Sequence, residues 1–281
     1  VRAGNSNESY YMQAVPKSTG ATGFTEVTWT EGAGVIQTIA PTSLMYATIY
    51  NNTFCVADSA ANLGVLVPGG HPTFNVSTAG DDESNPAPFW VGRQVSYLGT
   101  FQNRLVVGAG GVLSCSRTDD YLNFFRTTVL TLPADDAFEM LPTGSEDDVL
   151  RASVLYDQDL VIFGNKRQYI VSGNTALTPT SANMRVMTSF EQSADSAPVS
   201  AGGFIFYAKR GEAYSTIHQI QPGQTDNSPE SFPASSQLDN YLAGSAVEMA
   251  SLTGIPSMLF LRTTNTFTQF NAVGENSLYV F

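Results

Sequence analysis

The chain has 281 residues, which is enough for one large β domain or two ordinary domains with a substantial core. Hydrophobic residues make up 42% of it and charged residues only 14%, so it is globular by apolar content but poor in the charges that exposed helices carry. The formal net charge of -12 and the pI of about 4.4 argue against tight binding to nucleic acid.

The uncharged polar residues are mainly Thr, Ser, Asn, Gln and Gly, a mixture typical of half-buried strands joined by polar turns. An all-β fold is therefore predicted. No stretch reaches the ~20 consecutive apolar residues of a membrane helix, and no signal peptide is recognisable, so we expect a soluble protein. The chain begins at Val1 without a methionine and stops at Phe281 within an apolar, strand-like run, which indicates a fragment of a longer chain.

Five hairpins are predicted, each made of two alternating strands around a tight polar turn. In chain order they are residues 47–50 with 54–56 around 51–52, 104–107 with 112–115 around 110–111, 159–163 with 167–171 around 164–166, 204–207 with 213–217 around 210–211, and 257–261 with 267–270 around 264–265. Their first strands begin 45 to 57 residues apart. This spacing favours a β-propeller-like array of antiparallel blades over a plain sandwich.

Helical signals are few. Thr118 or Asp119 could cap one short turn through residues 121–125, and Asp239 could cap another through residues 240–242. Loops rich in Pro, Gly, Asp and Ser are expected at residues 78–88, 133–148 and 221–236. We expect residues 1–281 to form a single propeller-like region, with a subdivision into an N-terminal β segment, 1–90, and successive blades, 91–281.

Neighbouring carboxylates occur in four loops and raise the question of paired-carboxylate catalysis, as in glycosidases. Catalytic pairs usually come from separate elements, so we interpret these pairs as solvated loop faces. Two of the acidic runs could also offer oxygen ligands to calcium, but neither continues as a calcium loop. The four carboxylate runs are Asp81–Asp82–Glu83, Asp119–Asp120, Asp135–Asp136 and Glu146–Asp147–Asp148, and the two calcium candidates are Asp81–Asp82–Glu83 and Asp157–Gln158–Asp159.

The remaining reactive residue types give no motif. Cys55 and Cys115 lack metal-ligand spacing and are expected to be buried free thiols, while His71 and His218 have no nucleophile partner implied by position. Residues 108–111 resemble half of a dinucleotide loop, but a hairpin turn explains them better. Two Lys-Arg pairs, at 166–167 and 209–210, occupy equivalent places in two hairpins. They could form a small basic rim, but two exposed hairpin tips are the favoured interpretation. No catalytic, cofactor-binding or metal-binding residue is assigned, and no cofactor is expected.

The run from Gly80 to Arg93, with its acidic turn and Asn85-Pro-Ala-Pro88 segment, is followed by Phe101-Gln-Asn-Arg-Leu105. This order resembles the tail tubular protein B family, the nozzle proteins of T7-like short-tailed bacteriophages. Later segments agree in order across roughly residues 27–281: 114–117 with 121–125, 159–172, 177–180, 206–211 and 276–280. Residues 206–211 are less rich in proline and phenylalanine than the family pattern.

The resemblance implies a structural, non-enzymatic subunit of the virion tail tip. It would form a homo-oligomeric ring, expected to be a hexamer, below the tail adaptor protein and near the tail fibres. The genomic DNA would pass through without tight binding, and the bacterial surface remains open as a contact. The rival hypotheses are a carbohydrate-binding or carbohydrate-degrading propeller, which facing carboxylates beside Trp29 or Trp90 would favour, and a cellular propeller scaffold.

Overall fold

The computed structural model describes residues 2–3, 10–20, 23–39, 44–68, 73–144, 147–189, 196–210, 213–222, 229–238, 240–252, 258–265 and 275–280. They belong to two compact units, one formed by Val1–Met140 with Ala176–Ala182 and the other by Leu141–Thr175 with Asn183–Phe281. The single region and its subdivision near residue 90, expected from the sequence, remain predictions.

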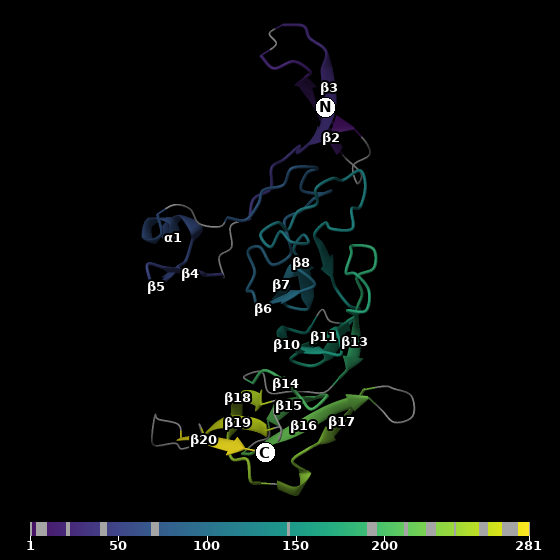
Figure 1. Cartoon of the computed structure of the whole chain (residues 1–281). Coiled ribbons are helices and arrows are strands. Elements are labelled where there is room, and N and C mark those ends of the chain that lie inside the picture. The colour runs from purple at the N-terminus through teal and green to yellow at the C-terminus, as the bar shows by residue number, and fades with distance from the viewer. Residues whose placement is uncertain are drawn as a thin grey trace. The chain divides into compact units, whose positions relative to one another are not determined.

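The all-β prediction is confirmed. Within the described ranges the chain forms 20 strands, one seven-residue helix, α1 (Ala60–Leu66), and one 3-10 turn, η1 (Ser236–Leu238). Paired strands run antiparallel in every sheet, and none of the described helices is long and apolar enough to cross a membrane (Figure 1). Antiparallel neighbours joined by short turns explain why period-two patterns dominate this sequence.

The first unit contains three sheets. Strands β1, β2 and β3 form one sheet in that order, and a four-stranded meander follows the chain order from β6 to β9. The third sheet is the hairpin of β4 and β5, which contacts the helix α1. The strands are β1 (Arg2–Ala3), β2 (Tyr10–Pro16), β3 (Val27–Gly32), β4 (Tyr46–Tyr50), β5 (Thr53–Ala57), β6 (Tyr97–Phe101), β7 (Arg104–Ala109), β8 (Val112–Cys115) and β9 (Phe138–Met140).

The second unit contains two four-stranded meanders and a three-stranded one, each again in chain order. Buried side chains from neighbouring sheets share cores: Phe163 lies with Tyr207, and Ile217 lies with Leu261. The strands are β10 (Leu150–Tyr156), β11 (Asp159–Gly164), β12 (Gln168–Val171), β13 (Met184–Thr188), β14 (Val199–Ala201), β15 (Phe204–Arg210), β16 (Ser215–Pro222), β17 (Pro229–Pro233), β18 (Ser245–Leu252), β19 (Met258–Asn265) and β20 (Glu275–Val280).

In the second unit, neighbouring meanders share buried cores, but this does not establish propeller blades. A closed ring of blades around an axis stays a prediction.

Two-residue turns fix the register of several hairpins. Asn51 and Asn52 adopt φ values of 47° and 59°, and Gln102 and Asn103 adopt 45° and 58°. Two consecutive positive φ angles match the right-handed twist of the flanking strands, which favours such turns in hairpins. The predicted hairpins at 47–56, 104–115 and 159–171 are confirmed.

Two hairpin predictions need correction. The strands of the fourth hairpin pair as expected, but Arg210 lies within β15, opposite Ser215, and not in the turn. The fifth is wrong: residues 264–265 continue β19, which pairs with β18 and β20, and residues 267–270 lie outside the described ranges. The apolar run simply continues through two threonines, which β-strands accept readily.

The short helical turn predicted through residues 121–125 is not present as a helix. Residues 118–123 form consecutive tight turns, with the Asp120 N–H donating to Arg117 O and the Asn123 N–H to Asp120 O, and Asp119 has a φ of 59°. Asp239 lies outside the described ranges. The helix α1 was missed, although Ser59 caps it by accepting a hydrogen bond from the Asn62 N–H at 3.2 Å.

Candidate functional site

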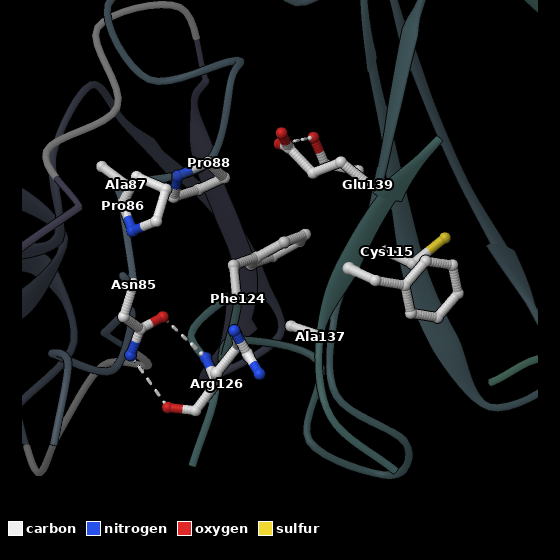
Figure 2. A pocket seen from close by; sticks show the side chains of 11 residues that line it. Asn85, Pro86, Ala87, Pro88, Cys115, Phe124, Arg126, Ala137 and Glu139 are labelled. Carbon is white, nitrogen blue, oxygen red and sulfur yellow. Dashed lines mark hydrogen bonds between the residues drawn. The ribbon is translucent and has the colours of Figure 1, made fainter. Parts of the chain in front are cut away.

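A pocket of about 110 Å³ lies in the first unit, between the Asn85–Pro88 segment and strands β8 and β9 (Figure 2). One wall is the proline-rich segment, and the opposite wall carries Cys115 and Glu139 from the two strands. The side chains of Phe124 and Arg126 lie between the two walls. The pocket thus sits on segments that carry the resemblance to nozzle proteins.

The polar groups of this pocket already hold the pocket itself together. The Asn85 side chain accepts from the Arg126 N–H at 2.9 Å and donates to Arg126 O at 3.0 Å. Its amide therefore pairs with both backbone groups of Arg126, as a residue on a neighbouring strand would. Glu139 accepts from the Phe89 N–H at 2.7 Å and from the Ser114 hydroxyl at 2.6 Å. These bonds fix the proline-rich segment to the sheet.

Cys115 is not an activated nucleophile. It is fully buried, and burial raises the pKa of its thiol to about 12, with the nearby Arg104 guanidinium acting weakly in the opposite direction. The thiolate is therefore scarce at neutral pH. Both cysteines are free, as predicted, but Cys55 is only half-buried, so its predicted burial was too strong.

The arginine of the Phe-Gln-Asn-Arg-Leu motif, Arg104, binds several main-chain carbonyls. Arg104 Nη1 donates to Ser116 O at 2.6 Å and to Asp136 O at 2.8 Å, and its Nη2 donates to Ala134 O at 3.0 Å. The guanidinium carbon lies 5.0 Å from the centroid of the Phe138 ring. A planar fork of five N–H groups can satisfy several carbonyls at once, which explains an arginine at this position.

The solvated-loop interpretation of the acidic runs is wrong for three members, because Asp81, Asp136 and Asp148 are buried. Asp81 accepts from the Ser84 N–H and hydroxyl and from the Tyr11 hydroxyl, and the bonds from Ser84 lower its pKa most.

Asp136 and Asp148 likewise accept hydrogen bonds from loop residues, at two other loops. Asp136 accepts from the Thr127 N–H and hydroxyl. Asp148 accepts from the N–H groups of Lys166 and Arg167, each at 3.1 Å, and from the Tyr169 hydroxyl at 2.9 Å. Buried carboxylates that accept several N–H bonds stabilise loops, and the neighbours Asp82, Asp119 and Asp147 are exposed as predicted.

No metal site is found in the part of the chain that the structure describes, where His, Cys, Asp and Glu form no group of three with suitable geometry. Asp157 and Gln158 form a hairpin turn with φ values of 45° and 72°, and Asp159 accepts from the Gly173 N–H at 2.8 Å. Local turn chemistry therefore explains this acidic run.

The two basic pairs do not form the same structure. Lys166 forms an ion pair with Asp147 at 2.5 Å, and Arg167 contacts Asp147 and Gly144 O. The second pair, Lys209 and Arg210, ends strand β15. Asp147 thus neutralises part of the predicted basic rim, and a rim shared by both pairs remains a prediction.

A serine lies beside His218, which sequence reasoning missed. Ser231 Oγ is 3.4 Å from His218 Nδ1 and 2.8 Å from the Tyr207 hydroxyl, and the His218 ring stacks on that of Tyr207. Burial and Lys209 lower the pKa of His218. The Ser–His distance is long for a nucleophile and its base, and the contact is only partly buried; His71 lies outside the described ranges.

The two tryptophans lie in different surroundings. Trp90 is 1% exposed and lies in a cluster with Phe74 and Phe124, with ring centroids 5.4 Å away from each. Trp29 is exposed on β3, but Glu31 of the same strand is already engaged by the Thr128 hydroxyl and the Val129 N–H.

The family model described as bacteriophage nozzle protein matches residues 2–280. The "Tail tubular protein gp12" of Escherichia phage T7 is 25% identical over 166 residues, which cover 59% of this chain and 21% of that protein. Among solved structures, the extracellular domain of a two-component system from B. thetaiotaomicron gives a TM-score of 0.37 at 12% identity, over 66% of this chain and 22% of that one.

The chain thus spans about a fifth of the length of the T7 relative. The family match covers the Asn85–Pro88 segment, the Arg104 motif and all the described sheets. The chain belongs to the bacteriophage nozzle protein family and is a structural component of the virion tail.

Proposed function

We propose that this chain forms part of the wall of the distal DNA-ejection channel in a short-tailed phage. The observation that carries the proposal is the nozzle-family match across residues 2–280. The subunits would close into a ring, expected to be a hexamer, that contacts the tail adaptor protein and supports tail fibre attachment. Closed rings follow naturally from one repeated heterologous contact between identical subunits.

The physical properties of the chain support a conduit. Its charge of -12 and its partly neutralised basic pair leave few cations to bind phosphates. A cationic wall would bind DNA at many phosphates, and the summed attraction would oppose ejection. Repulsive or weakly polar walls let the polyanion slide.

The structural role is also proposed to be the only role, without catalysis. The buried carboxylates support loops, and Cys115 is inert. The rival function, polysaccharide cleavage at the tail tip, would show as reproducible hydrolysis of a bacterial polysaccharide. Loss of that hydrolysis in Asp82→Asn, at an exposed position, would establish the rival and refute our proposal.

Electron cryo-microscopy of the intact tail tests the conduit directly. We expect a closed ring of this protein with neutral to acidic side chains toward the lumen. A monomeric protein in mature particles, or a lumen lined with Lys and Arg such as Lys166 and Arg167, would refute the proposal.

A further inference from the structure

The hairpin β4–β5 has one apolar face that the described residues leave bare. Directly opposed residues of an antiparallel pair point to the same side, and the register pairs Ala47 with Val56 and Ile49 with Phe54. These four side chains therefore share one face, which we call the outer face. Ile49 is 72% exposed and Phe54 is 70% exposed.

The opposite face of the same hairpin is covered. The helix α1 contacts both strands and buries Leu63, while Ala57 is buried and Cys55 is half-buried. Burial raises the pKa of Tyr46, which also points to this side. The hairpin is thus a sheet with a helix on one face and an apolar surface on the other.

Such a sheet is incomplete by itself. A two-stranded sheet is marginally stable in water, and its free strand edges and contiguous apolar surface favour association. In the described part of the chain, β4 and β5 pair only with each other. Met45, which precedes β4 and alternates with Ala47 and Ile49, is also exposed, at 70%.

Charge indicates which partner fits this face. Copies of a chain with a net charge of -12 repel one another, and a contact surface with few charges lessens this repulsion. Residues 44–68 carry a single charged side chain, Asp58. The segment is therefore suited to contact with another copy of the same acidic protein. It lacks the negative charges that would attract a cationic partner.

We propose that the outer face of β4–β5, formed by Ala47, Ile49, Phe54 and Val56, packs against a neighbouring copy of this protein. This inference rests on the ring of the proposed function and names the surface that closes it. The contact is heterologous: the outer face meets a different surface of the next copy, so that the interaction repeats around the ring.

The first experiment introduces two charges on the outer face of the full-length natural protein, with the double substitution Ile49→Asp and Phe54→Asp. Both side chains are exposed, so the fold should survive, as circular dichroism and the urea midpoint will show. Burying carboxylates in an apolar contact is unfavourable, and we expect the assembled fraction to fall about tenfold or more. The control is Leu98→Asp in β6 of the same unit. It also replaces an exposed apolar side chain with a carboxylate, and this variant should assemble normally.

The second experiment identifies the occupant. A photoreactive benzoylphenylalanine replaces Phe54 in tails assembled from equal amounts of ¹⁴N- and ¹⁵N-labelled protein. We expect cross-linked peptide pairs that combine one light and one heavy chain. Cross-links confined to one isotope, which report contact within a chain, or cross-links to another virion protein, would overturn the proposal.

The two ideas fail in different ways. If the wild-type protein stays monomeric in tails, both the proposed ring and the proposed interface are refuted. A wild-type ring that persists unchanged in the double variant refutes only this interface and leaves the conduit intact.

Discussion

The Arg104 guanidinium donates to the main-chain carbonyl of Asp136 at 2.8 Å, and neither residue is exposed. The Asp136 carboxylate in turn accepts from the Thr127 N–H at 3.1 Å. Strand β7 is thereby tied to the loop that precedes β9, and that loop supports one wall of the pocket. Such a buried polar centre positions a long loop through hydrogen bonds to its main-chain carbonyls.

We expect Arg104→Lys to lower the free energy of unfolding by about 2–4 kcal/mol, because an ammonium cannot serve the same carbonyls in a plane and leaves buried acceptors unpaired. Urea denaturation of the chain measures the effect. The control is Arg185→Lys on β13, where the side chain is exposed and little change is expected. Equal urea midpoints for Arg104→Lys and the wild type would show that the hydrogen bonds of Arg104 do not matter for stability.

A second prediction concerns Asp148 and Gly164. A Cβ added at Gly164 would lie 2.4 Å from Asp148 Oδ2, and that carboxylate is held by several hydrogen bonds. Gly164→Ala should therefore be strongly destabilising, although no unusual φ angle is involved. In an Asp148→Ala background the clash disappears, so the same substitution should cost about 1 kcal/mol less.

The test is a double-mutant cycle in urea, built from the two single variants and the double variant. Strict additivity of the two changes would mean that the close approach of Asp148 to Gly164 does not constrain the loop.

The sequence was sufficient for elements whose cause is local. Alternating apolar residues and the Asn51–Asn52 turn predicted a hairpin, and the resemblance in the Arg104 motif predicted the family. It was insufficient where the cause is distant. The burial of Asp148 depends on Lys166 and Arg167, 18 and 19 residues away, and the helix α1 needed the hairpin to cover its single buried leucine.

The same reasoning explains the site. Adjacent carboxylates look alike in a sequence, but folding buries Asp136 and leaves its neighbour Asp135 partly exposed. Arg117 donates a hydrogen bond to Asp135, and this bond lowers the pKa of Asp135. Ser231 and His218 meet only because β16 and β17 pair. No local pattern marks either relationship.

Thiol accessibility gives a third prediction. Cys115 is buried with a raised pKa, whereas Cys55 is half-buried on β5. We expect one thiol to react with a disulfide reagent at pH 8 in the native chain and two after denaturation. Cys55→Ser should abolish the native reaction and leave the denatured reaction of Cys115. Rapid native labelling of Cys115 would indicate that its core opens readily.

The last prediction concerns the acid sensitivity of the second unit. Burial, with a smaller contribution from Lys209, lowers the pKa of His218 below its ordinary value of 6.5, and the ring stacks on Tyr207 with its Nδ1 3.4 Å from Ser231 Oγ. The folded chain therefore binds fewer protons at this site than the unfolded chain does. Stability from His218 is complete above pH 6.5 and decreases as the pH falls from there toward the lowered folded pKa.

His218→Gln removes the titration and keeps a polar side chain of similar length. We expect the wild type to lose more stability than this variant between pH 7.5 and pH 5, as measured by urea midpoints at each pH. The carboxylates titrate in both proteins, so their contribution cancels in the comparison, and only the His218 term remains. Identical pH dependence in the two proteins would mean that the imidazole is as easily protonated in the folded chain as in the unfolded one. In that case the stacked contact with Tyr207 does not keep the ring neutral, and acid sensitivity must come from other groups.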